Sequence, residues 1–373
     1  MKLLVITHVN HTQKDNKFYG YAPYTREMNL WFRHVDEVTV IAPVRKRDLS
    51  AIDEPYSHSN LNVKNIPAIE FTSIGKSLVS FFKIPSILWT IYKACKSVDH
   101  IHLRCPGNVG LLGCFVQVLF PKTNKSAKYA GNWDPVSKQP WSYKLQKRIL
   151  KSEFLTKKMK ALVYGDWKET SKNIVPFFTA SYSENEKVEV KDKILDNKIH
   201  LLFVGTVSSN KRPMLSIKVV HHLIEKGHQA VLHIYGEGSE CEIIKDYIVN
   251  HNLSENVILY GNKTKEEVKK AYQSAHFLVF MSKSEGWPKV VAEAMFWKCL
   301  PISTNVSCIP QMLGFGERGS ILPPNETAIV LEIENYILSQ STYQEKANNA
   351  YNWSRKYTLD IFDKEIKNIL VEN

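Results

Sequence analysis

Short apolar runs of strand length alternate with helix-length segments along most of the chain. Three runs in the first half predict buried strands, at residues 3–6, 37–41 and 100–103. Residues 109–120 are almost wholly apolar, which predicts a helix buried against a sheet. The alternation continues from residue 201 to residue 329, with a helix predicted at 214–226. Alternating strands and helices are typical of α/β proteins with a parallel sheet.

The length of the chain indicates two domains. Its 373 residues exceed the roughly 250–300 residues over which a single core grows, and a hydrophobic content of 44% is ordinary for a globular protein. Residues 181–197 are rich in Lys, Asp and Glu and poor in large apolar side chains, so we predict the connection at residues 175–198. We therefore expect one domain at 1–175 and another at 198–350.

The most informative segment is a predicted strand-to-helix turn at residues 281–289. An apolar run at 277–281 has strand length, and apolar residues recur at helical spacing from 290 to 295. This pattern puts Glu285 in the loop and Glu293, eight residues later, on the helix. Pro288 fits the first helical position, where its missing N–H costs nothing.

The chemistry of this turn suits a nucleotide sugar. The free N–H groups of Lys289 and Val290 at a helix start favour an anion such as a diphosphate. A carboxylate accepts hydrogen bonds from neighbouring hydroxyls, so Glu285 is placed for a sugar and Glu293 for a ribose. The spacing alone also fits a solvated loop glutamate and a surface helix glutamate, and both interpretations stay open.

An ordered series of short motifs in the second half extends this picture, and residues 201–324 resemble the donor-binding domain of the family 4 retaining glycosyltransferases. The resemblance rests on residues 201–205, 211, 232–238, 257–261, 285–295 and 300–304. It implies that Glu285 contacts the donor sugar, Glu293 binds the ribose and Lys211 neutralises the diphosphate. Further donor-binding residues implied at these motifs are Gly205, Tyr260, Gly286, Trp287, Pro288, Lys289 and Val290.

The same resemblance implies the GT-B fold, in which two Rossmann-like domains face each other across a cleft. The end of the chain, at about residues 353–373, would then cross back onto the first domain. No Asp-x-Asp motif is present, so we expect a metal-independent reaction without a cofactor, using a UDP- or GDP-linked sugar as substrate. Retention is explained in this family by front-face attack, in which the departing phosphate takes the acceptor proton.

Two departures from the family pattern affect the site. Thr206 stands where an arginine is usual, and Arg212 either replaces that cation or is a solvated arginine. In the first domain, a single Gly20 replaces a glycine pair, and residues 129–134 lack the usual histidine. Asn132 and Asp134 are the nearest polar candidates for the acceptor side.

Basic charge is concentrated in the first half of the chain. Residues 1–175 hold 27 Lys and Arg against 13 Asp and Glu, a net charge of +14, whereas residues 176–373 hold 22 against 24, a net charge of −2. Residues 144–160 carry seven basic residues beside an apolar stripe, which predicts a basic helix on an anionic membrane. Residues 77–95 are a second candidate. Both segments also fit ordinary surface helices that pack on their own domain.

Other features indicate a cytoplasmic protein. The six cysteines have no metal-ligand spacing and lie mostly among apolar neighbours, as reduced thiols do. His8 and His11 lack a nearby cysteine or carboxylate, so we expect no metal site there. The apolar run at 3–6 is too short for a signal peptide, and neither candidate helix can span a bilayer. We expect a peripheral protein at the cytoplasmic membrane face.

Together these features predict a retaining glycosyltransferase that moves a sugar from a nucleotide-diphosphate donor to a saccharide or lipid-linked saccharide in surface polysaccharide assembly, such as capsule or lipopolysaccharide. An alternative is a nucleotide-sugar epimerase on a similar fold, which needs no acceptor surface. A nucleic-acid-binding protein would explain the isoelectric point of 9.2 but not the pair Glu285 and Glu293. We therefore expect no nucleic-acid partner.

Overall fold

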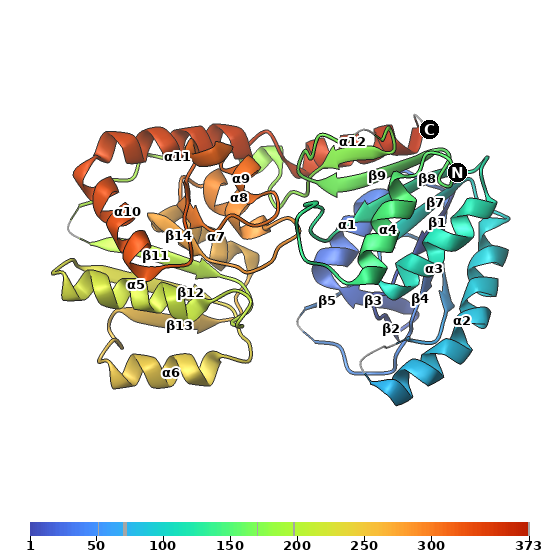
Figure 1. Cartoon of the computed structure of the whole chain (residues 1–373), viewed down its shortest axis with the longest axis horizontal. Helices are drawn as coiled ribbons and strands as arrows, with labels where there is room; N and C mark the ends of the chain where they lie inside the picture. Colours follow the sequence, from blue (N-terminus) through green and yellow to red (C-terminus); the bar gives the residue numbers. More distant parts are fainter. Residues whose placement is uncertain (51, 70–72, 170, 197, 372–373) are drawn as a thin grey trace. The chain divides into compact units, whose positions relative to one another are not determined.

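The computed structural model describes residues 1–50, 52–69, 73–169, 171–196 and 198–371. The chain divides into two compact units, Met1–Phe177 with Asp363–Asn373, and Phe178–Phe362 (Figure 1). Each unit is built on a parallel β-sheet with helices on both faces. The prediction of an α/β protein with two domains is therefore confirmed.

The first unit contains a seven-stranded sheet in the order β10-β9-β8-β7-β1-β4-β6, and every neighbouring pair in it is parallel. Its strands are β1 (Lys2–Ile6), β4 (Glu37–Ala42), β6 (Leu61–Asn65), β7 (His100–Cys105), β8 (Asn124–Tyr129), β9 (Met159–Tyr164) and β10 (Ile174–Phe177). A small antiparallel sheet is formed by β2 (Thr12–Lys14), β3 (Lys17–Tyr21) and β5 (Asp53–Pro55).

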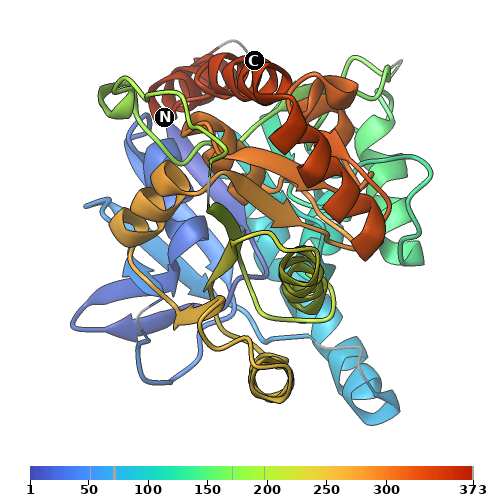
Figure 2. The same ribbon diagram turned by 90° about the vertical axis from the view of Figure 1, so that its left-hand side faces the viewer.

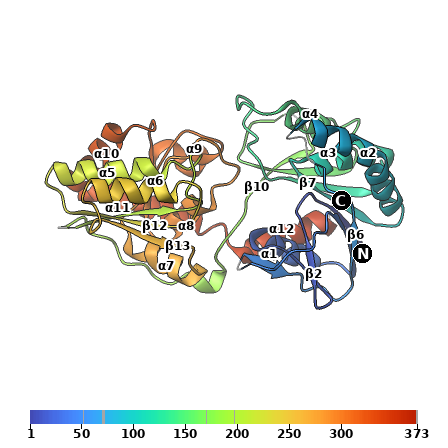
Figure 3. The same ribbon diagram turned by 90° about the horizontal axis from the view of Figure 1, so that it is seen from below.

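Helices cover both faces of the first sheet (Figure 3). One face carries α2 (Ile74–Cys95), α3 (Asn108–Val116) and α4 (Trp141–Lys151), and the other carries α1 (Ala22–Phe32) and the end of α12 (Leu359–Val371). The predicted helix at 109–120 is α3 followed by a 3-10 turn at Gln117–Leu119.

The second unit contains a six-stranded parallel sheet in the order β13-β12-β11-β14-β15-β16. Its strands are β11 (Ile199–Val204), β12 (Ala230–Tyr235), β13 (Val257–Gly261), β14 (Phe277–Phe280), β15 (Leu300–Ser303) and β16 (Ser320–Ile321). Its helices are α5 (Pro213–Glu225), α6 (Cys241–Asn250), α7 (Lys265–Ser274), α8 (Lys289–Phe296), α9 (Ile309–Met312), α10 (Glu326–Leu338) and α11 (Gln340–Ser354). Figures 2 and 3 show α5 and α7 on opposite faces of this sheet.

Each sheet has its own hydrophobic core. In the second unit, alternate residues of β11 such as Leu201 and Phe203 pack with Ile217 of α5 and are fully buried. In the first unit, Leu4 and Ile6 of β1 lie in a separate buried cluster. Two cores are what a hydrophobic content of 44% in 373 residues allows.

Two sequence predictions need correction. The connection predicted at 175–198 starts too early, because residues 175–177 belong to β10, which pairs with β9 and ends at the buried Phe177. The basic segment 144–160 is not one helix: α4 ends at Lys151, and Lys160 lies in β9. Lys158 lies between them with a φ of 52°, which no α-helix accommodates.

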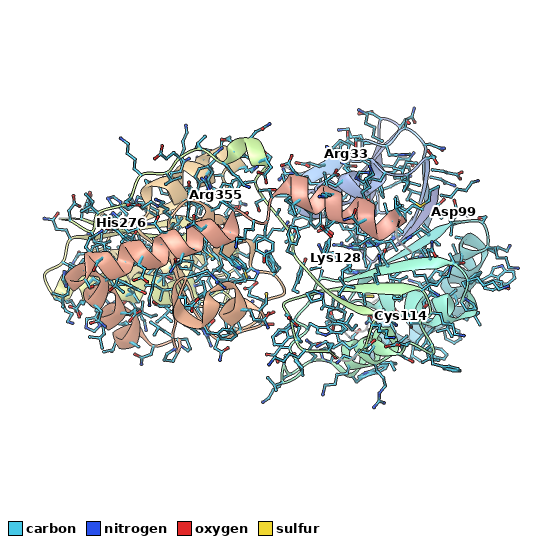
Figure 4. All side chains as sticks on the ribbon, turned by 90° about the horizontal axis from the view of Figure 1, so that it is seen from above. Arg33, Asp99, Cys114, Lys128, His276 and Arg355 are labelled. Atoms are coloured by element: carbon cyan, nitrogen blue, oxygen red, sulfur yellow. The ribbon has the colours of Figure 1, made fainter. Side chains whose placement is uncertain are left out.

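The first unit also buries a cluster of charged side chains. Glu27 of α1 is bonded to Arg104 of β7, and the Nζ atom of Lys128 lies 3.4 Å from a Glu27 carboxylate oxygen. Lys128, labelled in Figure 4, has no exposed side chain. One carboxylate therefore lies beside two cations within the unit.

Candidate functional site

The loops that carry the predicted donor residues all leave the carboxyl ends of parallel strands in the second unit. Gly205 follows β11, Gly236 follows β12, Gly261 ends β13, and residues 281–288 follow β14. In open parallel sheets this edge is where ligands bind.

Two glycine turns at this edge approach each other closely. Gly205 and Gly236 have φ values of +142° and +135°, which disfavour any residue with a side chain. A Cβ atom on Gly236 would lie 1.9 Å from the carbonyl oxygen of Gly205. By contrast, a Cβ atom on Gly205 would meet nothing within 4 Å, so its backbone borders open space. A ligand can therefore approach the main chain at Gly205.

Lys211 and Glu285 form an ion pair although they are 74 residues apart in the sequence. The Glu285 side chain is only 9% exposed, and the Nζ atom of Lys211 lies 5.0 Å from the centre of the Phe280 ring. A backbone hydrogen bond also joins the same two loops: the Lys283 N–H donates to the Asn210 carbonyl at 2.8 Å. The structure thus brings together a cation and a carboxylate that the sequence predicts for one site.

Arg212 occupies a specific position beside this pair. It is the residue before α5, with a φ of 53°, and its Nη1 atom donates to the Met281 carbonyl oxygen at 3.2 Å. The guanidinium is therefore attached to the loop after β14. Its role as the cation that replaces the arginine missing at Thr206 stays a prediction.

Both carboxylate oxygens of Glu293 are engaged within the second unit. Ser181 Oγ donates to Oε1 at 2.5 Å, and Tyr272 OH donates to Oε2 at 3.0 Å. Burial, with the Glu293 charge beside it, raises the pKa of Tyr272 well above its ordinary value, so the phenol stays protonated and remains a donor. These bonds fix the carboxylate on α8, and each oxygen keeps a further lone pair. Sequence reasoning missed Ser181 and Tyr272, because neither belongs to a motif.

The helix after the Glu285 loop begins one residue later than predicted. Pro288 has φ −77° and ψ 88° and precedes α8, so its assignment to the first helical position is wrong. Its carbonyl accepts from the Val291 N–H at 3.0 Å, while Lys289 and Val290 form the first helical positions. The N–H groups of Lys289 and Val290 come before the first i→i−4 bond of this helix, so the predicted anion-binding character stays a prediction for these two groups.

The loop between Glu285 and Pro288 is held from the next strand. The Gly286 carbonyl accepts from Ser307 Oγ at 2.8 Å and from Cys308 Sγ at 3.4 Å. The Trp287 ring lies 6.2 Å from the Tyr357 ring. Ser307 and Cys308 follow β15, and no sequence motif marks their supporting role.

A cavity of about 480 Å³ lies at the same edge of the sheet, beside β12, β13 and α6. Tyr260, predicted for donor binding, lines it, and its ring stacks on Tyr235 with centres 4.5 Å apart. Val207, Ile234 and Leu259 give the cavity apolar walls, and Glu237 and Lys245 add polar groups. Only the glycines in its lining mark this cavity in the sequence.

The acceptor-side candidates of the first unit each have a defined local structure. Asn132 Oδ1 accepts from the Asp134 N–H at 2.9 Å, and Asp134 Oδ1 accepts from the Val136 N–H at 2.9 Å, so both side chains stabilise their own turn. Gly20 is a buried residue of β3, where a Cβ atom would lie 2.9 Å from Thr25 Oγ1.

Among the described residues, no group of three or more His, Cys, Asp or Glu side chains is placed to hold a metal ion. Within the same residues, no helix is both long and apolar enough to cross a membrane. His11 contacts the Val9 carbonyl and Tyr56 OH, and burial lowers its pKa to about 4.

Comparison with known proteins supports the sequence resemblance. The family described as "Glycosyl transferases group 1" matches residues 184–353. A glycosyltransferase of Methanocaldococcus jannaschii is 24% identical over 196 residues, covering 52% of this chain and 50% of that protein. The alpha-D-kanosaminyltransferase of Streptomyces kanamyceticus is 21% identical over 198 residues, covering 52% of this chain and 51% of that protein. The chain spans about half the length of the curated relatives it matches.

Solved structures of similar fold cover the whole chain. Anabaena HepE in complex with UDP superposes with a TM-score of 0.70 at 11% identity and covers 100% of both chains. The lipopolysaccharide outer core galactosyltransferase WaaB superposes with a TM-score of 0.69 at 16% identity and covers 100% of this chain and 99% of that one. The chain therefore has the GT-B fold, and its residues 184–353 match the family described as glycosyl transferases group 1.

Proposed function

We propose that this chain is a retaining glycosyltransferase that moves a sugar from a nucleotide-diphosphate donor to a saccharide or lipid-linked saccharide acceptor. The observation that carries the proposal is the ion pair between Lys211 and Glu285 at the ligand-binding edge of the second sheet. A phosphate oxygen can accept from Lys211 Nζ at the point where a sugar hydroxyl donates to Glu285. In this proposal the pair therefore holds a diphosphate and a sugar next to each other.

The nucleoside occupies the remainder of the same edge in this proposal. The cavity beside Tyr260 has apolar walls and polar groups at its rim, which suits a heteroaromatic base. Glu293, oriented by Ser181 and Tyr272, accepts from the ribose hydroxyls. UDP is the first nucleotide to test, because HepE, a structural neighbour, is described in complex with UDP.

Charge on the leaving diphosphate is stabilised without a metal ion in this proposal. Lys211 supplies one cation, Arg212 supplies a second from the same turn, and the start of α8 supplies backbone N–H groups. The acceptor oxygen forms its bond to the anomeric carbon on the face that the phosphate leaves. The departing phosphate oxygen keeps the electron pair of the broken bond and takes the acceptor proton.

A role in surface polysaccharide assembly belongs to the same proposal, since WaaB, a structural neighbour, is described as a lipopolysaccharide galactosyltransferase. We place the chain at the cytoplasmic face of an anionic membrane. The basic cluster on α4 is a weaker docking surface than the sequence predicts: Lys147 lies over the Tyr129 and Trp133 rings, and burial lowers its pKa to about 8.

Helix α2 offers a stronger membrane surface. Phe81 and Phe82 are 67% and 80% exposed, and Leu78, Val79 and Trp89 are also exposed on the same helix. The 22 residues of α2 include three lysines and no Asp or Glu. Figures 1 and 2 place the start of α2 beyond the edge of the first sheet. Exposed aromatic residues beside lysines suit an anionic lipid surface.

Donor turnover tests the proposed function. Purified protein is incubated with UDP- and GDP-linked sugars, and release of the nucleoside diphosphate is measured for the wild type, Glu285→Gln and Lys218→Ala. Lys218 is an exposed residue of α5, so its variant controls for loss of a lysine. We expect Glu285→Gln alone to lose release. Isomerisation of a donor sugar without release would instead identify an epimerase.

A further inference from the structure

A second cavity, of about 280 Å³, lies in the first unit at the carboxyl ends of β1, β4 and β7. His8 and Asn10 border it from the segment after β1, Arg45 from the segment after β4, and Gly107 and Asn108 from the turn between β7 and α3. The acceptor-side residues predicted from the sequence do not line it.

The strand order explains why the cavity forms here. The chain passes from β1 to β4 and β6 on one side of β1, and then returns through α2 to β7 on the other side. The loops after β1 and β7 therefore leave the sheet in opposite directions. This topological switch point is where open α/β sheets form a ligand-binding crevice.

The turn after β7 is shaped to admit the histidine. A Cβ atom on Gly107 would lie 2.6 Å from the Nδ1 atom of His8, so only glycine allows the imidazole to lie against this turn. The Gly107 N–H donates to the buried side chain of Gln146 at 3.3 Å, which fixes the turn from α4. The turn that borders the cavity is thus held by a contact with α4.

The polar lining is suited to an anion. Among the described lining residues are one arginine, one histidine, two asparagines and one tyrosine, and none is Asp or Glu. A guanidinium matches the geometry of phosphate oxygens, and amide, imidazole and phenol groups donate further hydrogen bonds. Burial, with the Arg104 charge, lowers the pKa of His8, so its neutral ring supplies one N–H donor at neutral pH.

We infer that this cavity binds a phosphoryl group of the acceptor, so that the acceptor is a phosphate ester. The inference depends on the proposed function, because the phosphate ester is the molecule that receives the sugar in that reaction. A volume of about 280 Å³ is just below the ~300–1,000 Å³ of pockets for drug-sized ligands. It fits a phosphoryl group with part of one sugar, and a whole nucleotide sugar exceeds it. Both a soluble sugar phosphate and a lipid-linked sugar carry this chemistry.

Binding of phenyl phosphate tests the inference in the whole protein, by isothermal titration in a phosphate-free buffer. Arg45→Gln should weaken binding at least ~10-fold, as expected for loss of a charged hydrogen bond. Lys46→Gln is the matched control, because it removes the same charge from the exposed neighbouring residue and should leave binding unchanged. His8→Gln keeps a side-chain donor and should weaken binding by a smaller factor.

Lys211→Ala separates this cavity from the donor site in the second unit. Phenyl phosphate binding that survives Lys211→Ala and is lost in Arg45→Gln supports the inference. Binding lost in Lys211→Ala and kept in Arg45→Gln would overturn it. Failure of the proposed function would be a different result. In that case the protein would neither bind nor turn over a nucleotide sugar, whether or not it binds phenyl phosphate.

Competition identifies the source of the phosphate. Glucose 1-phosphate in solution and undecaprenyl phosphate in neutral vesicles are each added against phenyl phosphate. Displacement by the first supports a soluble acceptor, and displacement by the second supports a lipid-linked one. If neither displaces phenyl phosphate, the cavity does not bind acceptor phosphates and the inference is wrong.

Discussion

Replacing Lys211 by alanine should reduce turnover by at least ~100-fold. The Lys211 side chain is 22% exposed and its partner Glu285 is 9% exposed, so the pair acts in a site from which water is largely removed. Loss of one charge-stabilising donor from such a site costs about 2.7–4 kcal/mol, or roughly 10²–10³ in rate. Arg212 and the start of α8 remain in the variant, which favours the lower end of this range. The unpaired Glu285 carboxylate also repels the diphosphate.

The assay is the initial rate of nucleoside diphosphate release at saturating donor. Lys218→Ala should stay within about twofold of the wild type, and circular dichroism checks that each variant is folded. Lys211→Arg keeps the charge with a different geometry and should retain more activity than Lys211→Ala. If Lys211→Ala keeps more than about a third of the wild-type rate, Lys211 is not part of the charge-stabilising machinery, and the ion pair only joins two loops.

Other expected outcomes test separate parts of the molecule. Glu293→Ala should weaken binding of the free nucleoside diphosphate by titration, whereas Glu285→Ala should leave that affinity nearly intact and remove turnover; equal losses would contradict the division of roles. Burial lowers the pKa of His276 to about 4, while the unfolded imidazole titrates near 6.5. The unfolded state therefore binds more protons between these values, and stability should fall by about 2 kcal/mol per such histidine from pH 7 to pH 5 in urea unfolding, less so in His276→Asn. Glu27→Gln should destabilise the first unit by about 3–5 kcal/mol in the same assay, since two buried cations lose their carboxylate. Phe82→Ser should reduce co-sedimentation with anionic vesicles more than Arg148→Gln does, and a larger effect of Arg148→Gln would assign the membrane surface to α4 instead.

The regular elements of the fold could be predicted because their hydrophobic pattern is local. Residues 3–6, 37–41 and 100–103 all lie in strands of the first sheet, and the helix predicted at 214–226 is α5. A strand that is buried on both faces has a continuous apolar sequence, which can be recognised without knowing the strand it pairs with. The strand β10 was missed because its four residues include Pro176, and its identity depends on pairing with β9.

The donor site could be predicted only as far as its motifs extend. Lys211 and Glu285 lie in loops that the glycine turns and strand ends mark in the sequence, and the parallel sheet then brings those loops to one edge. Ser181 and Tyr272, which hold Glu293, come from segments without any motif. Supporting contacts of this kind depend on the packing of helices, and no short-range pattern records them.

The cavity of the first unit could not be predicted from local sequence patterns either. His8 belongs to a short polar segment after β1, and Arg45 belongs to a basic run of three residues that reads as solvated surface. What joins them is the order β7-β1-β4, which is a property of the whole sheet. The sequence pattern instead points to Asn132 and Asp134, which cap their own turn. Under the proposed function, phosphate-binding measurements on Arg45 and His8 variants are therefore a more direct route to the acceptor than the histidine that residues 129–134 lack.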